Sequence, residues 1–217
     1  MKPPQGKSSR LTRQSGIIIS FEREARQKIL TSVRRHGPAV DGFLFRKPVL
    51  LEEDFDIIGE AHELADSLRL KAPLVADWRI EPPLGPDEIP TTSARVLREG
   101  GFGMTIFAIG YPPSFIRTCA SQSQAKVFPV IDLGRKDVMQ YFPDRAVMTL
   151  ARASRKFGCP WVIMSARNAS RIRTVSEAKI SGLSILAYLE PGTQRGVGLA
   201  SGADFEITPL AKFEGEA

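Results

Sequence analysis

Two charged residues, Asp77 and Arg79, stand at the end of an apolar segment where their types and spacing could do chemistry. The segment 73–80 reads PLVADWRI, which is typical of a buried strand. Side chains two positions apart on a strand point to the same face. A carboxylate and a guanidinium placed together can stabilise charge on a bound molecule, or they can form a structural ion pair. Both interpretations stay open on these residues alone.

A second acid, Glu88, follows after the proline-rich stretch EPPLGP. The next residues include a pair of threonines, Thr91 and Thr92, either of which can cap a helix. Gly100 and Gly101 provide a stop signal for that helix. The sequence therefore predicts a strand, an irregular connection that carries acids, and a helix.

The stretch 191–196, PGTQRG, is a candidate anion-binding loop. Backbone N–H groups of Gly192 and its neighbours can cradle a phosphate, and barrels commonly bind phosphate after their seventh and eighth strands. Pro-Gly is also a common turn pair, so an ordinary turn is equally consistent with these residues.

The elements that must position these residues alternate along the chain. Helical stripes such as Ala25, Ile29 and Val33 separate apolar runs at 16–21, 42–45, 73–80, 104–110, 126–133, 160–166, 183–191 and 203–208. Runs that are apolar on both faces indicate a parallel sheet covered by helices. Eight such repeats favour a closed (β/α)8 TIM barrel in a single domain, with a doubly wound open sheet as the alternative.

In a closed barrel the site lies at the carboxyl ends of the strands. Besides Asp77 and Arg79, the polar or charged residues that we expect there are Ser20, Arg46, Lys47, Asp132, Ser165 and Glu190. The two histidines, His36 and His62, fall in helical stretches and are expected at the surface.

Composition excludes several classes of protein. The 217 residues are 42% hydrophobic and 25% charged, as in an ordinary globular domain. The net charge of +6 owes four charges to residues 1–14, expected to be a flexible basic tail before a barrel at 15–217. The sequence contains no nucleic-acid-binding motif and no apolar run long enough to span a membrane. Its two cysteines are not spaced as metal ligands. We expect a cytoplasmic protein without contact to nucleic acid or membrane.

Several motifs, taken in order, resemble the orotidine 5'-monophosphate decarboxylase family. APLVADWRI is similar to the family's strand with an Asp-x-Lys-x-x-Asp motif, and EIPTT to the Asp-Ile-Pro-Asn-Thr that closes it. EPGTQRG resembles the family's phosphate loop, and SGADFEIT its last strand. The resemblance covers about residues 16–213. It implies a TIM barrel, a homodimer with shared active sites, no metal and no organic cofactor.

The resemblance also implies roles for particular residues. Asp77, Arg79 and Glu88 correspond to the charge array in which a lysine protonates the substrate carbon as carbon dioxide leaves. A phosphorylated nucleotide would be bound through positions that match Thr92, Gly192 and Gln194, with Arg195 as a further cation. These residues form the predicted site.

This chain departs from the family pattern at several of these positions. Arg79 stands where the lysine belongs, and arginine holds its proton too tightly to be a good proton donor. Glu88 lies 11 positions after Asp77, against five in the family. Gly134 replaces a serine, and Pro209–Leu210 replaces the Gly-Arg pair that grips phosphate. Strand two lacks the family lysine near Leu44, although Arg46 and Lys47 are close in sequence.

Three functions remain open on this basis. The chain is a divergent decarboxylase of orotidine monophosphate in pyrimidine biosynthesis, a catalytically impaired paralogue that binds a phosphorylated ligand, or a sugar-phosphate lyase of the same superfamily. The third class uses magnesium, and the EIPTT segment argues against it.

Overall fold

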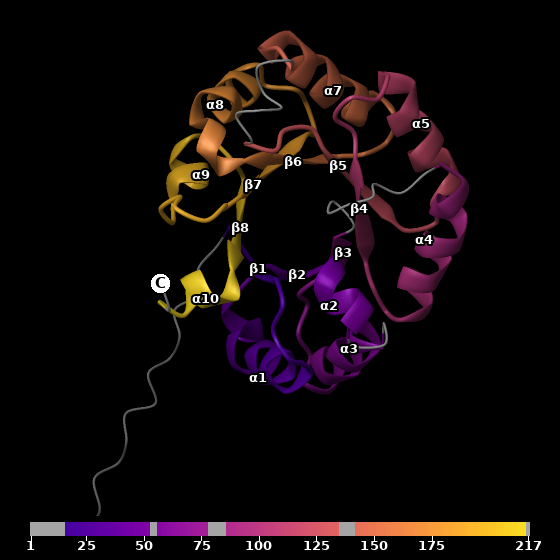
Figure 1. Ribbon diagram of the computed structural model, residues 1–217, viewed down its shortest axis with the longest axis vertical. Coiled ribbons are helices and arrows are strands. Elements are labelled where there is room, and N and C mark those ends of the chain that lie inside the picture. The colour runs from indigo at the N-terminus through magenta and orange to yellow at the C-terminus, as the bar shows by residue number, and fades with distance from the viewer. Residues whose placement is uncertain (1–15, 53–55, 78–85, 135–141, 216–217) are drawn as a thin grey trace, which may run out of the picture.

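Eight parallel strands close into a barrel in which each strand pairs with the next and β8 returns to β1 (Figure 1). The computed structural model describes residues 16–52, 56–77, 86–134 and 142–215. The strands are β1 (Ile17–Phe21), β2 (Gly42–Arg46), β3 (Leu74–Asp77), β4 (Gly103–Phe107), β5 (Lys126–Val130), β6 (Trp161–Ser165), β7 (Ser184–Tyr188) and β8 (Phe205–Pro209). The predicted TIM barrel is confirmed, and the open-sheet alternative is wrong. The predicted tail, residues 1–14, lies outside the described residues.

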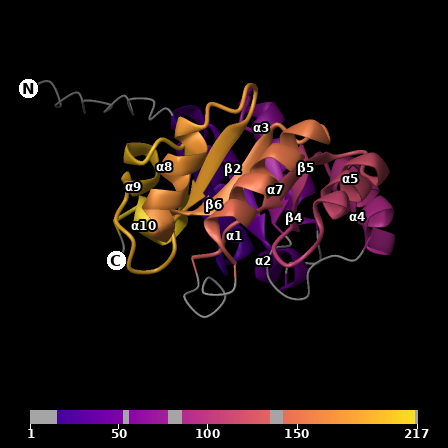
Figure 2. The same ribbon diagram turned by 90° about the horizontal axis from the view of Figure 1, so that it is seen from above.

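Helices surround the barrel and cover the outer faces of its strands (Figures 1 and 2). The α-helices are α1 (Arg26–His36), α2 (Lys47–Glu52), α3 (Ile57–Ser67), α4 (Ile89–Arg98), α5 (Pro113–Gln122), α7 (Asp144–Lys156), α8 (Ala169–Glu177), α9 (Val197–Ala200) and α10 (Leu210–Phe213). Short 3-10 segments are η1 (Gly37–Ala39), η2 (Pro86–Glu88) and η3 (Ala166–Asn168).

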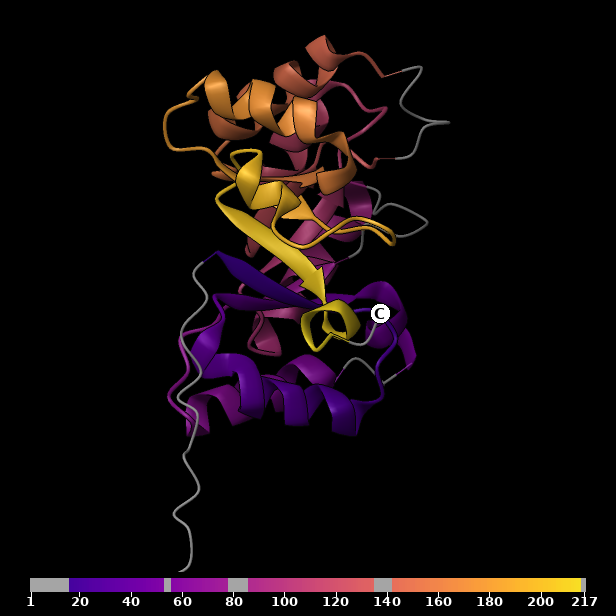
Figure 3. The same ribbon diagram turned by 90° about the vertical axis from the view of Figure 1, so that its left-hand side faces the viewer.

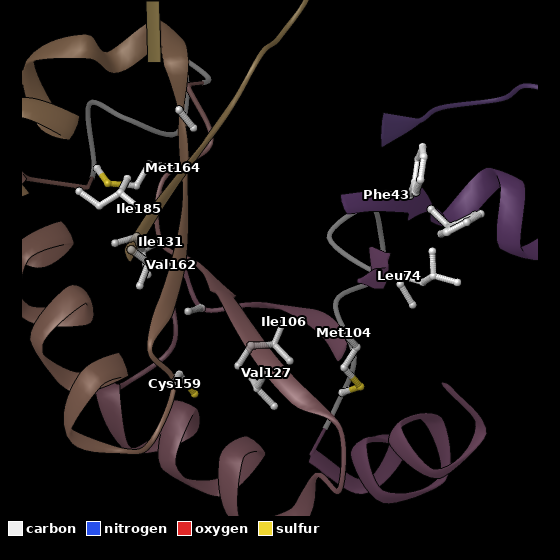
Figure 4. Packing of buried hydrophobic residues seen from close by; sticks show 14 of the residues in the cluster. Phe43, Leu74, Met104, Ile106, Val127, Ile131, Cys159, Val162, Met164 and Ile185 are labelled. Carbon is white, nitrogen blue, oxygen red and sulfur yellow. The ribbon is translucent and has the colours of Figure 1, made fainter. Parts of the chain in front are cut away.

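The core has two layers because the strands bury both faces. Side chains inside the barrel include Ile18, Leu44, Val75, Phe128, Val130, Ile163, Leu186 and Ile207. Side chains between the strands and the helices include Phe43, Leu74, Met104, Ile106 and Val127, which Figure 4 shows in a layer outside the strands. Each fully buried aliphatic or aromatic side chain contributes roughly 1.5–3 kcal/mol to the free energy of folding. These layers fix the strand ends, and therefore the site.

Two local predictions are wrong. The helix expected to start at Thr91 or Thr92 begins earlier, at Ile89 with Glu88 as its N-cap, because Pro90 fits the first turn of a helix. His36 is buried and not at the surface, since its ring packs edge-on against Phe213 and its Nε2 lies 3.0 Å from Glu214 Oε1.

Two further findings concern the described residues. Cys119 and Cys159 are free and buried, and burial raises the pKa of each thiol to about 12. Neither thiol is therefore ionised near neutral pH. No helix within the described ranges is long and apolar enough to cross a membrane.

Candidate functional site

Asp77 is fully buried at the carboxyl end of β3, where neighbouring strands supply its partners. Arg46 occupies the paired position at the end of β2, and its Nε lies 3.6 Å from Asp77 Oδ2. From β4, the Thr105 hydroxyl donates a hydrogen bond of 2.6 Å to Asp77 Oδ1. The carboxylate that the resemblance places in the charge array is thus held between a cation and a hydroxyl of its own barrel.

Arg46 also connects Asp77 to a second acid, Glu22, which follows β1. Arg46 Nη1 donates to Glu22 Oε2 over 2.7 Å and also to the Tyr188 hydroxyl. Tyr188 in turn donates to Glu22 Oε1 over 3.0 Å, and Ser20 donates to the same oxygen over 2.8 Å. The guanidinium lies over the Tyr188 ring, 5.0 Å from its centroid. Polar groups from β1, β2, β3, β4 and β7 therefore meet in one network at the barrel mouth.

A separate acidic centre surrounds Asp132, which follows β5. Asn168 Nδ2 lies 2.9 Å from both carboxylate oxygens, and Arg171 Nη1 lies 3.6 Å from Oδ1. Arg171 Nε also pairs with Asp144 at 2.6 Å. Burial raises the pKa of Asp132, and Asn168 and Arg171 oppose that effect only in part.

Gly134 has a structural reason to replace the serine expected from the resemblance. Its φ of +68° is unfavourable for residues with a Cβ, and a Cβ there would stand 2.0 Å from the Ser165 hydroxyl oxygen. The space that a serine at 134 would use is therefore already filled from β6.

Basic side chains surround the loop 191–196, which joins β7 to α9. Lys212, on α10, donates through Nζ to the Glu190 carbonyl at 3.0 Å and to the Thr193 carbonyl at 2.6 Å. Arg167, in η3, donates to the Pro191 carbonyl. Figure 3 shows this loop and α10 at the same end of the barrel. The loop is thus fastened from two sides by cations.

The backbone amides at the end of this loop already have an internal anion. Glu206 is fully buried on β8, and its carboxylate accepts from the Gly196 N–H at 2.9 Å and from the Gly198 N–H at 3.1 Å. Thr193 N–H bonds to the Glu190 carbonyl at 3.1 Å. A phosphate at this loop would therefore depend on side chains and on the amides nearer Gly192.

The predicted site residues lie in different surroundings. Gly192, Gln194 and Arg195 are exposed on the loop, with Arg195 stacked 5.0 Å from the Phe213 ring centroid. Glu88 is exposed at the start of α4, whereas Asp77 is fully buried, so one protomer does not place these two acids in a common environment. Thr92 is partly buried within α4. Arg79 lies outside the described residues.

Sequence reasoning missed several residues of these clusters, among them Glu22, Tyr188, Arg167 and Lys212. Lys212 was detectable in principle, because it lies three positions after Pro209, where the resemblance expects a phosphate-binding arginine. Glu22 and Tyr188 meet from opposite ends of the sequence, so no local pattern indicates their contact. Within the described part of the chain, no group of three or more histidine, cysteine, aspartate or glutamate side chains is arranged to hold a metal ion.

The fold and the mouth together define a (β/α)8 barrel with charged and polar side chains at the carboxyl ends of its strands. No protein-family model matches the sequence, and no curated protein matches it either.

Solved structures of orotidine 5'-monophosphate decarboxylases have the same fold. The enzyme from Metallosphaera sedula matches with a TM-score of 0.70 at 14% identity, over 93% of this chain and 91% of its own. The Methanocaldococcus jannaschii enzyme complexed with the inhibitor BMP matches with a TM-score of 0.75 at 15% identity, over 92% and 91%. Orotidine 5'-phosphate decarboxylase from Pyrococcus horikoshii OT3 matches with 0.74 at 15%, over 91% of each chain. The resemblance expected from the sequence is thus confirmed as a likeness of fold.

Proposed function

We propose that this chain binds a phosphorylated small molecule of the nucleotide monophosphate class at the barrel mouth, as a catalytically impaired relative of orotidine monophosphate decarboxylases. The observation that carries the proposal is the set of three cations, Arg167, Arg195 and Lys212, around the exposed loop 191–196. Phosphate oxygens are favourable partners for guanidinium and ammonium groups. The name of the structurally similar enzymes supports the same class of ligand.

Impairment is proposed from the residues around Asp77. In this chain the carboxylate is held by Arg46 and Thr105, and arginine replaces lysine at position 79. Proton transfer to carbon is most efficient from a group whose pKa lies near the working pH, which arginine does not offer. Binding without decarboxylation is therefore the function we favour.

Decarboxylation of orotidine monophosphate is the second candidate. The retained Asp77 supports it, because the acid is buried at the strand end where the resemblance places the charge array. A steady fall in the absorbance of orotidine monophosphate, faster than in buffer and abolished by Asp77→Asn, would establish this candidate over the first. A sugar-phosphate lyase would instead convert a sugar phosphate and show no preference for nucleotides.

The binding proposal is tested by thermal shift and calorimetry with uridine monophosphate and uridine. We expect uridine monophosphate to raise the melting temperature and uridine to leave it unchanged. The double variant Arg167→Ala and Arg195→Ala should weaken binding by at least about tenfold, equivalent to ~1.4 kcal/mol. Arg152→Ala, which removes an exposed cation from α7, is the matched control and should bind normally. Equal shifts in melting temperature with uridine monophosphate and with uridine would contradict binding through the phosphate.

The proposal includes a homodimer in the cytoplasm, as the resemblance implies. In that arrangement Glu88 of one protomer would face the mouth of its partner. Light scattering during size-exclusion chromatography measures the mass directly. A monomer of 23.9 kDa at all concentrations would remove the shared-site part of the proposal without affecting phosphate binding.

A further inference from the structure

The network around Arg46 is arranged like a binding site for a carboxylate. Its three donors stand on three strands: Ser20 on β1, Arg46 on β2 and Tyr188 on β7. All three residues are at most 9% exposed, so their positions are set by the barrel. Two of the donors bond to one oxygen of Glu22 and the third bonds to the other oxygen, so both carboxylate oxygens have a donor.

Glu22, the acceptor, is more exposed than its three donors and lies outside the strands. Glu22 follows β1 instead of lying within it, and its side chain is 31% exposed. Its backbone has an anchor of its own, since Glu24 Oε2 accepts from the Glu22 N–H at 2.6 Å and from the Arg23 N–H at 3.1 Å. The side chain can therefore leave the network while the loop keeps its shape.

A pocket of about 520 Å³ has Glu22 and Arg46 in its wall, together with Arg23, Glu24, Lys28 and Pro48. That volume is within the range of small-molecule sites. The pocket thus has room for the body of a ligand whose acidic group reaches Arg46.

We propose that Ser20, Arg46 and Tyr188 bind the carboxylate of a small molecule, which enters by displacing the Glu22 side chain into solvent. The exchange replaces one carboxylate by another, so each buried donor keeps an acceptor and the charge beside Arg46 is unchanged. Glu22 loses little, because an exposed carboxylate is well solvated.

Asp77, which lies behind Arg46, favours a carboxylate over a phosphate at this guanidinium. Asp77 Oδ2 lies 3.6 Å from Arg46 Nε, so a negative charge already stands behind the guanidinium. A dianionic phosphate would meet stronger repulsion there than a monoanion would. The inference goes beyond the proposed phosphate site, because it uses none of the cations around the loop 191–196.

Benzoate and its uncharged analogue benzamide are the probes, measured by calorimetry and saturation-transfer NMR on the full chain. We expect wild-type protein to bind benzoate weakly and benzamide not at all. Glu22→Ala should bind benzoate about tenfold more tightly, because the internal competitor is gone. Adding Tyr188→Phe to the Glu22→Ala variant should weaken its affinity for benzoate several-fold. Glu63→Ala, which removes an exposed acid from α3, is the control and should bind as wild type does.

Three outcomes would overturn the inference. The first is that neither the wild type nor Glu22→Ala binds benzoate, and the second is that the two bind it equally. The third is that only Glu22→Ala binds it, which would mean that the Glu22 side chain does not leave the network in the wild type. If Glu22→Ala does not fold, Glu22→Gln keeps the size and removes the charge, and the same comparison applies. Benzoate carries no phosphate, so these results are independent of the test with uridine monophosphate.

Discussion

Arg46 and Asp77 stand side by side at paired positions of β2 and β3, with Arg46 Nε 3.6 Å from Asp77 Oδ2. The sequence resemblance expects a lysine on strand two, and Arg46 is the cation that strand two presents to Asp77. The guanidinium of Arg46 also donates to Glu22 and Tyr188, so Asp77 belongs to a network whose members are partners of one another. Buried ion pairs of this kind are costly to break because the surviving charge loses its partner.

Replacement of Asp77 by alanine is therefore expected to destabilise the fold as well as to alter the site. The buried guanidinium would lose one acid and Thr105 would lose its acceptor, at a cost of about 3 kcal/mol in the free energy of unfolding. Urea denaturation followed by circular dichroism measures this. Asp66→Ala, which removes a carboxylate that is 70% exposed beside His62, should change stability by less than about 1 kcal/mol. An Asp77→Ala protein as stable as wild type would show that Arg46 needs no acid at β3.

The barrel was predictable because each strand is apolar on both faces and a helical stripe or turn signal follows it. The same reasoning placed Asp77 and Arg46 at the mouth, since the ends of parallel strands converge. The contacts themselves were not predictable. The choice of Glu22 and Tyr188 as partners of Arg46 depends on strand register and closure, which bring together residues 166 positions apart. The helix start at Ile89 was missed because two good capping residues lie inside the helix.

Glu206 is expected to stabilise the loop that leads into α9. Glu206→Gln would replace one acceptor oxygen by an N–H group facing a backbone N–H, so one of the two amide bonds is lost and the other loses its charge. The expected cost is about 2 kcal/mol in the free energy of unfolding. Glu177→Gln, at an exposed end of α8, is the control. Unchanged stability would mean that the loop does not need this acid.

Gly134→Ser tests whether the serine of the family pattern can be restored. We expect a loss of about 2 kcal/mol or more, since the left-handed backbone costs roughly 1–2 kcal/mol for a residue with a Cβ and the Ser165 oxygen stands in the way. Gly110→Ser separates the two causes, because Gly110 has a φ of +83° with nothing within 4 Å of its would-be Cβ.

The clash with Ser165 can be isolated by a double-mutant cycle. In the Ser165→Gly background, Gly134→Ser should lower the free energy of unfolding only about as much as Gly110→Ser does in the wild type. The reduction in cost relative to Gly134→Ser alone is a favourable coupling energy. Additive effects would instead mean that the backbone alone requires glycine at this position.

Asp132 should give the stability of the protein a pH dependence of a definite sign. Burial raises the pKa of Asp132 in the folded state above its ordinary value of 3.8, so between these two values the folded chain binds more protons than the unfolded chain. Its protonated form is the one that the fold favours, and this contribution is present at low pH. As the pH rises from 3.8 through the raised pKa, the unfolded state ionises more readily and stability falls.

The prediction is checked by urea denaturation of wild-type protein and of Asp132→Asn at several values from pH 4 to neutral. The free energy of unfolding of the wild type, taken relative to that of Asp132→Asn, should decrease with rising pH, because the amide does not titrate. Asp144→Asn is a matched control, since Asp144 pairs with the same Arg171 but has a side chain that is 73% exposed. Both the wild type and Asp144→Asn keep Asp132. The difference between their free energies of unfolding should therefore show no comparable fall with rising pH, because desolvation of Asp132 is the source of that fall. A wild type that becomes more stable than Asp132→Asn as the pH rises would mean that Asn168 and Arg171 outweigh burial, so that the fold favours the ionised form of Asp132.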